Sequence, residues 1–287
     1  MVFTPKSRCI EAGRAETTVS DDNWRLDELV CRLTLLLFVL TAITTWAVES
    51  RADDQSKNGT KALAWEFAVS PYLWAAGLEG ETGTLPGLPP ADVDESFSDI
   101  LDDLEFAGMV TGAAKKGRYG FSGDLQYVET TAKDNSLAPL FRREEVTSKS
   151  LIVSAMGDYF VAEDGRSNLI LSAGARVWSV ETNLKLSSGV LAGRTIKGDD
   201  TWVDPVVGAR GSLELGSAAF LVGWGFIGGF GIGSEIMADL FGGVGYRFSE
   251  TTSATVGYRW MKVNRDEDGF LYNVVQKGIL AGLTIEF

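Results

Sequence analysis

From about residue 63 onward, the chain consists of short segments in which apolar and polar side chains alternate. A period of two residues predicts strands with one apolar face. Turn residues separate about ten such segments, and no further long apolar run lies among them. We expect strands at roughly 64–77, 105–115, 118–129, 148–161, 167–181, 201–213, 217–230, 235–248, 252–264 and 273–287.

The connections between these segments alternate in length. Those after even-numbered segments are short and polar or contain glycine, as at 116–117 and 162–166, whereas three of the others are long, at 78–104, 130–147 and 182–200. Short turns at one rim and long loops at the other are typical of outer-membrane barrels, and an even strand number leaves both termini in the periplasm. The sequence therefore predicts an all-β fold, a closed antiparallel transmembrane β-barrel of about 10 strands, within a range of 8 to 12.

Aromatic residues gather near both ends of the apolar faces. Trp65, Tyr119 and Phe287 lie at the short-turn end, and Tyr127 and Trp260 lie at the long-loop end. Such girdles border the apolar band of membrane barrels. The alternative is a β-sandwich with these aromatics in its core, which would expose a glycine-rich, charged face on both sheets. For segment 217–230, the residues expected to face outward are Phe220, Val222, Trp224 and Phe226.

One strongly apolar run, 33–47, precedes the strands. It is too short to cross a bilayer of about 30 Å as a helix, but it suits the apolar core of a secretory signal. We expect 31–52 to be a signal peptide cleaved after Ala47 or Ala52, 53–62 to be a polar lead-in, and 63–287 to be the barrel. Residues 1–30 are long and acidic for the start of a signal, so we interpret them as an extended, non-native leader.

Composition removes several classes of function. A net charge of −13 and the lack of a basic arm argue against nucleic-acid binding. The sequence has no histidine, which excludes imidazole bases and histidine metal ligands. Cys9 and Cys31 both precede the expected cleavage sites, which excludes thiol chemistry in the exported chain. No motif indicates a cofactor or a metal, and no spacing singles out a carboxylate pair for glycoside hydrolysis. We expect no enzymatic activity.

The inward faces of the strands carry acids and bases in nearly equal number. Confined charges must pair, because an isolated buried ion is costly. We interpret these residues as a salt-bridged lumen that holds the barrel shut. The alternative is a narrow pore for small solutes, gated or cation-preferring, because carboxylates along a path favour cations. The candidate network consists of Glu66, Glu105, Lys115, Asp124, Asp158, Arg176, Asp204, Arg210, Asp239, Arg247, Arg259 and Glu286.

The first long connection is strongly acidic. Between residues 79 and 103 it carries eight acids and no base. Four of its last apolar residues have the spacing of a short amphipathic helix, and Ser96 or Ser98 is placed to cap the start of that helix. We expect either a helical lid across the barrel mouth or a solvated acidic loop that meets divalent cations among outer-leaflet lipids. The four apolar residues are Phe97, Ile100, Leu101 and Leu104.

Four stretches carry a resemblance to a known family. They are Ser70–Leu78, Val93–Leu101, Gly123–Tyr127 and Trp202–Arg210. With them the chain resembles the small single-chain outer-membrane β-barrel proteins of Gram-negative bacteria, and more narrowly a proteobacterial group whose motifs are structural and name no substrate. The resemblance extends over essentially the whole chain from residue 63.

This resemblance implies location in the cell outer membrane, insertion by the barrel-assembly machinery, contact with outer-membrane lipids including lipopolysaccharide, and a monomer. Gly282, Ile285 and Phe287 fit the terminal signal that the assembly machinery reads in such barrels, although Leu280 occupies its polar position. We expect an integral outer-membrane barrel with a structural or surface-interaction role. The narrow pore remains the alternative.

Overall fold

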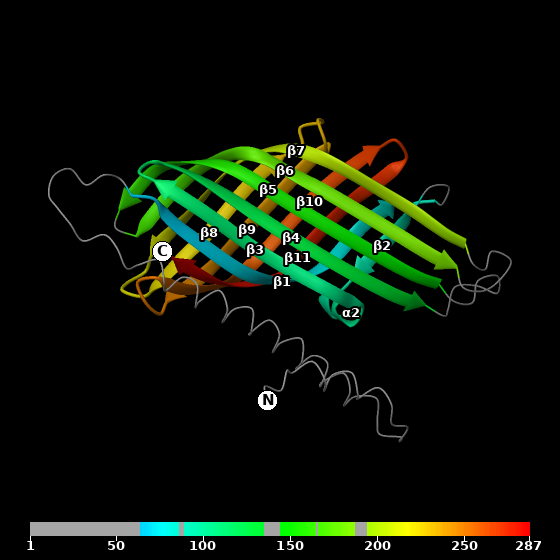
Figure 1. Cartoon of the computed structure of the whole chain (residues 1–287), viewed down its shortest axis with the longest axis horizontal. Coiled ribbons are helices and arrows are strands. Elements are labelled where there is room, and N and C mark those ends of the chain that lie inside the picture. Colours follow the sequence, from blue (N-terminus) through cyan, green and yellow to red (C-terminus); the bar gives the residue numbers. More distant parts are fainter. Residues whose placement is uncertain (1–63, 86–88, 135–143, 165, 187–193) are drawn as a thin grey trace, which may run out of the picture. The chain divides into compact units, whose positions relative to one another are not determined.

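The structure is a computed structural model, which describes residues 64–85, 89–134, 144–164, 166–186 and 194–287 (Figure 1). The leader, signal peptide and polar lead-in expected before residue 63 lie outside these ranges. Within the described part of the chain, no helix is long and apolar enough to cross a membrane. The elements are β1 (Glu66–Gly83), β2 (Ala91–Glu95), α2 (Phe97–Asp102), β3 (Leu104–Lys116), β4 (Tyr119–Asp134), β5 (Glu144–Asp164), β6 (Ser167–Leu186), β7 (Arg194–Glu214), β8 (Ala219–Gly228), β9 (Ile236–Arg247), β10 (Thr252–Glu267) and β11 (Phe270–Glu286).

Ten antiparallel strands, β1 and β3 to β11, close into a barrel. β2 adds a short eleventh strand that pairs with the C-terminal part of β1, from Leu78 to Thr82. β11 pairs with β1 in the register that places Val69 opposite Ile285. The backbone N–H of Phe67 donates to the carbonyl oxygen of Phe287 at 2.9 Å, and the reciprocal bond is equally long. The closed antiparallel barrel is confirmed, and the sandwich alternative is wrong because the sheet closes on itself.

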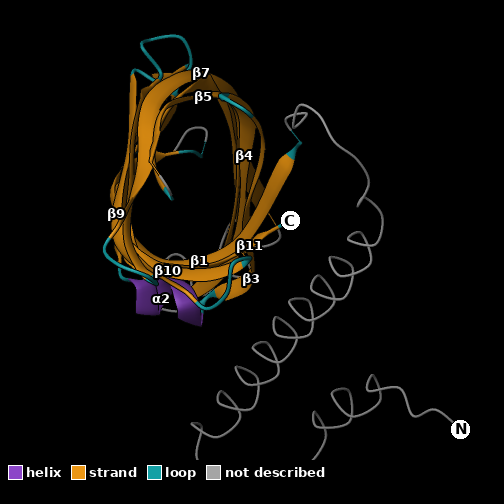
Figure 2. Ribbon diagram, turned by 90° about the vertical axis from the view of Figure 1, so that its left-hand side faces the viewer, coloured by secondary structure: helices purple, strands orange, loops and turns teal. Residues whose placement is uncertain are grey.

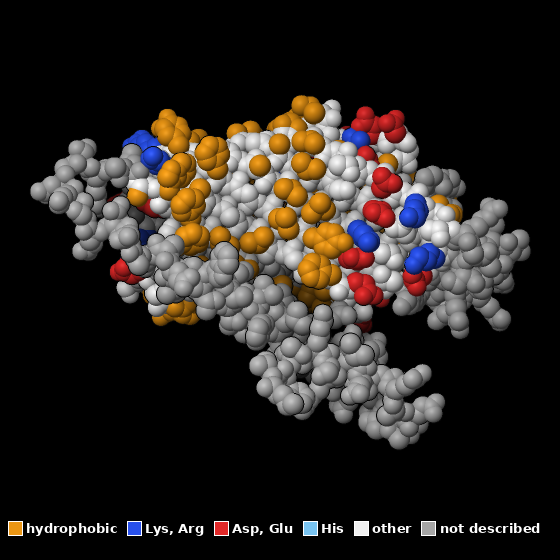
Figure 3. Space-filling view, in the orientation of Figure 1, with side chains coloured by type: hydrophobic (Ala, Val, Ile, Leu, Met, Phe, Trp, Pro, Cys, Tyr) orange, Lys and Arg blue, Asp and Glu red, His pale blue; other side chains and the backbone are white. Residues whose placement is uncertain are grey.

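Apolar side chains form a belt across the face of the barrel that Figure 3 shows. Alternation sends every second side chain outward, and large apolar side chains on almost every strand are exposed, among them Leu73 (53%) and Val244 (52%). Aromatic pairs strengthen the rim at which β1 begins and β11 ends, where Phe67 stacks on Phe287 at 5.9 Å between ring centroids. An apolar surface of this extent is unfavourable in water and favourable in lipid.

The expected faces of one strand are reversed. In β8, Phe220 is buried, and Val222, Trp224 and Phe226 pack against the lumen core, whereas Leu221 and Ile227 are exposed. Neither face of β8 carries a charged residue, so its pattern of apolar residues does not show which face points into the lumen. The aromatic side chains face inward because they fill the lumen, where Trp224 stacks on Phe241 at 4.1 Å.

Several strands continue past the ends that the apolar pattern indicates. β6 and β7 extend through most of the segment 182–200 that we expected to be a loop, and β4 and β5 also run further. Their outward faces there carry opposite charges on neighbouring strands, such as Lys149 and Glu129 at 3.1 Å. These extensions project beyond the belt, as the charged side chains past one edge of it show in Figure 3.

The expected helix forms as α2, and Ser96 is its cap. The Ser96 hydroxyl accepts from the backbone N–H of Asp99, whose carboxylate accepts from the N–H of Ser96, a reciprocal capping box. Figure 2 shows α2 outside the ring of strands, beside β1 and β3. The lid interpretation is therefore wrong.

Close contact between β1 and β11 gives a test of closure. A Cβ at Gly278 would lie 1.8 Å from the carbonyl oxygen of Ala75, whereas a Cβ at Gly242 would meet no atom within 4 Å. We expect Gly278→Ala to lower the free energy of unfolding by about 1–3 kcal/mol through overpacking, measured by urea titration of the refolded barrel. Gly242→Ala serves as the control and should stay within about 0.5 kcal/mol of the parent. Equal stability of the two variants would contradict the register.

Candidate functional site

Three charged side chains from different strands meet in the centre of the lumen. Asp239 of β9, Arg259 of β10 and Arg176 of β6 all lie on inward faces, with exposed fractions of 1%, 2% and 3%. The charge of Asp239 points inward because exposed Leu240 beside it faces lipid, and the same alternation applies to Arg259 beside Tyr258. Charges at such depth require partners.

The carboxylate of Asp239 accepts hydrogen bonds from both arginines. Arg259 donates from Nε to Oδ1 at 3.0 Å and from Nη2 to Oδ2 at 2.7 Å, which is a bidentate pair. Arg176 donates from Nη2 to Oδ2 at 2.9 Å. The indole N–H of Trp224 completes the set at 3.0 Å from Oδ1. The carboxylate thus accepts four hydrogen bonds.

The contacts continue across the lumen to the opposite wall. Arg259 Nη1 lies 3.4 Å from the hydroxyl of Tyr72 on β1, and this hydroxyl donates to Asp124 Oδ1 of β4 at 2.7 Å. Arg259 Nη2 also lies 3.9 Å from Asp124 Oδ2. We call Asp239, Arg176, Arg259, Asp124 and Tyr72 the cross-barrel network. Two acids balance two arginines, so the network carries no net charge.

Apolar and aromatic side chains surround the cross-barrel network. The indoles of Trp178 and Trp202 stack with centroids 5.8 Å apart, and Phe270 and Tyr272 pack against Trp202. The Arg259 guanidinium lies 4.5 Å from the centroid of the Trp74 ring. This low-dielectric setting strengthens the paired charges and makes any unpaired one costly.

A second cluster lies toward the rim of the short turns, such as the turn between β5 and β6. Asp158 of β5 accepts from the Ser172 hydroxyl at 2.5 Å and from Arg210 Nη2 at 2.7 Å. The Nε of Arg210 is buried without a hydrogen-bond partner, although the side chain as a whole is part exposed. At the rim, Arg247 pairs with Glu214 and stacks over Phe220.

Asp204 has a different role from the other candidate residues. It is fully buried and accepts from the backbone N–H of Ser234 at 2.5 Å and from its hydroxyl at 2.8 Å. The indole of Trp202 donates to the same hydroxyl at 2.9 Å. Asp204 therefore fastens the connection between β8 and β9 to β7 instead of binding an arginine.

Four further candidate residues lie away from the lumen core. Glu105 occupies a register irregularity between Leu104 and Phe106 and lines a shallow groove on the outer wall, beside Glu129. The expected inward position of Glu105 is wrong, because a bulge breaks the alternation on which it depends. Glu66 and Glu286 are exposed at the rim where β1 begins and β11 ends. Lys115 is also at that rim, 3.7 Å from Glu66 and paired with Glu163.

Sequence reasoning did not identify several polar partners. Tyr72 and Ser154 lie on expected inward faces, but nothing in the pattern shows that Tyr72 binds Asp124 or that Ser154 accepts from Arg176 Nε at 2.9 Å. Trp224 was expected outside, and Ser234 lies in a connection. A useful signal for Tyr72 is that a buried tyrosine hydroxyl usually has a partner.

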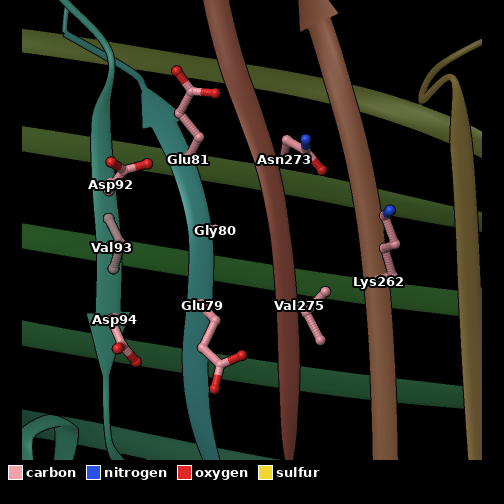
Figure 4. Close-up of a pocket in the computed structure, with 9 residues that line it drawn as sticks. All are labelled: Glu79, Gly80, Glu81, Asp92, Val93, Asp94, Lys262, Asn273 and Val275. Atoms are coloured by element: carbon pink, nitrogen blue, oxygen red, sulfur yellow. The ribbon is translucent and has the colours of Figure 1, made fainter.

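Acids on the outer wall form a shallow depression of about 490 Å³ where β1, β2, β10 and β11 run together (Figure 4). Glu79 and Glu81 of β1 lie opposite Asp94 and Asp92 of β2. Lys277 pairs with Glu79 at 2.6 Å. Within the described residues, no group of three or more histidine, cysteine, aspartate or glutamate side chains is arranged to hold a metal ion.

The carboxylates around α2 differ in acidity. Burial, and then the charge of neighbouring carboxylates, raises the pKa of Glu95 and the pKa of Asp103. The hydrogen bond from the Ser96 hydroxyl, followed by that from its backbone N–H, lowers the pKa of Asp99. Asp99 therefore keeps the charge that caps the helix to lower pH than its neighbours keep theirs.

Comparison with known proteins gives only distant likenesses. No family model and no curated protein matches the chain. Among solved structures, the chain is similar to the outer membrane protease OmpT from Escherichia coli (10% identity, 81% of this chain and 100% of that chain, TM-score 0.46). It is also similar to the translocator domain of the autotransporter NalP from Neisseria meningitidis (10%, 91% and 98%, TM-score 0.47) and to Ail of Yersinia pestis (11%, 78% and 98%, TM-score 0.32).

These values are too low to support any conclusion about activity or partners, so the assignment rests on the closed barrel and its apolar belt. The chain folds as an outer-membrane β-barrel. Closed antiparallel barrels with an apolar exterior, aromatic girdles and short turns at the rim of the termini reside in the outer membrane of Gram-negative bacteria.

Removing the charge of Asp239 tests the cross-barrel network. Asp239→Asn leaves two buried arginines with only Asp124, 3.9 Å from Arg259, to balance them, so we expect the free energy of unfolding to fall by about 3–5 kcal/mol. Urea titration followed by tryptophan fluorescence measures this. Asp268→Asn is a matched control, because Asp268 is exposed and has a φ of 53° that asparagine tolerates. A loss at Asp239 no larger than at Asp268 would contradict the network.

Proposed function

We propose that the protein is an integral outer-membrane barrel with a structural or surface-interaction role, whose lumen the cross-barrel network closes. The observation that carries this proposal is the burial of Asp239 between arginines from two strands, with the chain of contacts continuing to β1 and β4. Side chains from opposite walls meet there and leave their polar groups paired. A barrel of this size has a lumen that side chains can fill.

The aromatic residues next to the network support a closed lumen. Trp178, Trp202 and Tyr272 are buried, and they add a second obstruction along the axis of the barrel. A water-filled path would hydrate these side chains. Their burial therefore favours a structural or surface role over constant conduction.

A narrow, gated pore is the second candidate, and the polarity of the closure favours it. The network consists of flexible arginine side chains and carboxylates, which can be solvated if they separate, whereas an apolar plug cannot. The partly exposed Arg210 below it offers a polar approach from the periplasm. Opening would require breaking the bidentate pair of Arg259 with Asp239.

We propose no enzymatic role. The sequence has no histidine, and the lumen carboxylates of Asp124, Asp158 and Asp239 each accept hydrogen bonds from neighbouring side chains. Carboxylate oxygens that already accept hydrogen bonds from neighbouring side chains are poorly placed to take a proton from a substrate. The alternative of a hydrolytic carboxylate pair has no support in their geometry.

The terminal residues support an assembly role. Phe287 lies at the apolar periplasmic rim, and a Cβ at Gly282 would lie 3.2 Å from the Cβ of Tyr72, so a small residue suits this position. We propose that Gly282, Ile285 and Phe287 are read by the barrel-assembly machinery before β11 pairs with β1. Outer-membrane lipids including lipopolysaccharide are the proposed surroundings, and the barrel closes on itself as a monomer.

Planar-bilayer recordings separate the two candidate functions. We expect the wild-type barrel to give no stable conductance steps, and Arg176→Ala with Arg259→Ala to give them, because the double change removes both cations that close the lumen. Arg166→Ala, at an exposed rim position, serves as the control and should stay silent. Stable steps from the wild type would instead support the pore.

A further inference from the structure

β7 continues well beyond the end of its neighbour β8. The two strands pair only as far as Val206 opposite Gly228. Just past this pair, Gly229 donates its backbone N–H to the carbonyl oxygen of Pro205 at 3.1 Å, and the chain then turns toward β9. Within the described part of the chain, residues 195–201 of β7 therefore have a neighbouring strand on the β6 side alone. We call their other side the β7 edge.

The backbone groups of a strand alternate in direction. The N–H and C=O groups of one residue point to one side of the strand, and those of the next residue point to the other side. The carbonyl group of Pro205 points toward β8, and the pairing of β6 with β7 has no register shift. The N–H and C=O groups of the odd-numbered residues from 195 to 201 thus point away from β6. The N–H of Thr201 donates to the Asp200 carboxylate at 2.8 Å, as expected where no strand lies alongside.

The β7 edge lies beyond the apolar belt. Val203 is the last apolar outward residue before it, and the outward side chains of the edge itself are polar and exposed. Water can satisfy backbone groups at this position, so the barrel folds without a partner there. A row of unpaired backbone groups is also a template on which another extended chain can form a strand. The outward residues of the edge are Thr195, Lys197, Asp199 and Thr201.

Two charges on the β7 edge are unpaired. Among the described residues, neither Lys197 nor Asp199 forms an ion pair. Lys197 lies opposite Asn183 of β6, whereas Asp199 lies opposite Glu181, which has the same charge. Like charges directly opposite each other on neighbouring strands are unfavourable, and opposite charges are favourable. A strand added at this edge is therefore stabilised by an acid opposite Lys197 and a base opposite Asp199.

We propose that the β7 edge binds an extended segment of a protein partner at the cell surface, which adds to β7 as an antiparallel strand. The proposal deepens the surface-interaction role and rests on it. Backbone hydrogen bonds to the odd-numbered residues hold the segment, and the two edge charges select its sequence. Along the partner chain, a basic residue opposite Asp199 is followed two positions later by an acidic residue opposite Lys197.

A second copy in the same membrane does not fit this edge. Every β7 runs from the long-loop rim toward the rim of the short turns. An antiparallel partner runs the opposite way, so a second β7 in that place would belong to an inverted barrel. The geometry therefore favours a segment of another protein.

Amide hydrogen exchange followed by NMR tests the proposal on the refolded full-length barrel in detergent micelles. The probe is a peptide with capped ends and the sequence Thr-Ser-Lys-Val-Glu-Val-Thr, which places its lysine opposite Asp199 and its glutamate opposite Lys197. One control peptide exchanges the lysine and the glutamate. The other carries N-methyl groups on these two residues, which removes the N–H groups that face β7.

We expect the amides of Lys197 and Asp199 to exchange fast in the free barrel and about tenfold more slowly with saturating probe. The amides of Ile196 and Gly198, which face β6, should exchange slowly throughout. Neither control peptide should give this protection. The proposal is overturned if the amides of Lys197 and Asp199 are already slow in the free barrel, if the probe leaves them fast, or if the N-methylated peptide protects them equally.

Reversing the edge charges gives a second test. Lys197→Glu with Asp199→Lys changes two exposed side chains, and this barrel should bind the charge-exchanged peptide in preference to the probe. Equal protection by the two peptides in both barrels would contradict the charge selection and overturn the proposal. Protection that instead grows with barrel concentration, without any peptide, would identify a second copy as the occupant and also overturn it. These results do not depend on conduction, so their failure leaves the closed lumen standing.

Discussion

A chain inside a bilayer must satisfy its own backbone hydrogen bonds, because hydrocarbon offers none. The pairing of β11 with β1 meets this requirement by removing the free edges of the sheet. Closure divides the side chains by alternation into a lipid-facing set and an enclosed set. Apolar residues such as Leu73 and Ile279 face outward, and charged residues such as Asp239 and Arg259 have only the lumen to occupy.

Enclosure then requires the charges to pair, and pairing closes the lumen. Asp239 accepts from two arginines of separate strands, and Arg259 continues to Tyr72 and Asp124 on the far side. Neutralising the charges and obstructing the axis are therefore results of the same contacts.

Much of the fold follows from the alternation of apolar and polar residues. The two-residue period of the strands, the lengths of the turns and the apolar outward residues at the end of β11 are all consequences of strands that cross a bilayer. The alternation does not predict the strand ends or faces correctly where no lipid contacts the outward residues or where no charged residue marks the inward face. β6 and β7 continue beyond the lipid, where charge pairs replace apolar residues, and β8 has no charged face to orient Phe220 and Trp224. A bulge places Glu105 outside. The inward charges are visible in the sequence, but their partners depend on lumen geometry, so the central position of Asp239 was not predictable.

The osmotic water permeability of proteoliposomes tests the closed lumen most directly, because water is the smallest solute that an open path would pass. Stopped-flow light scattering after an osmotic shift measures it in vesicles with and without the wild-type barrel. The network predicts the same shrinkage rate in both, because paired charges and buried aromatic rings leave no continuous water path. A rate that rises in proportion to the amount of barrel would contradict the closed lumen.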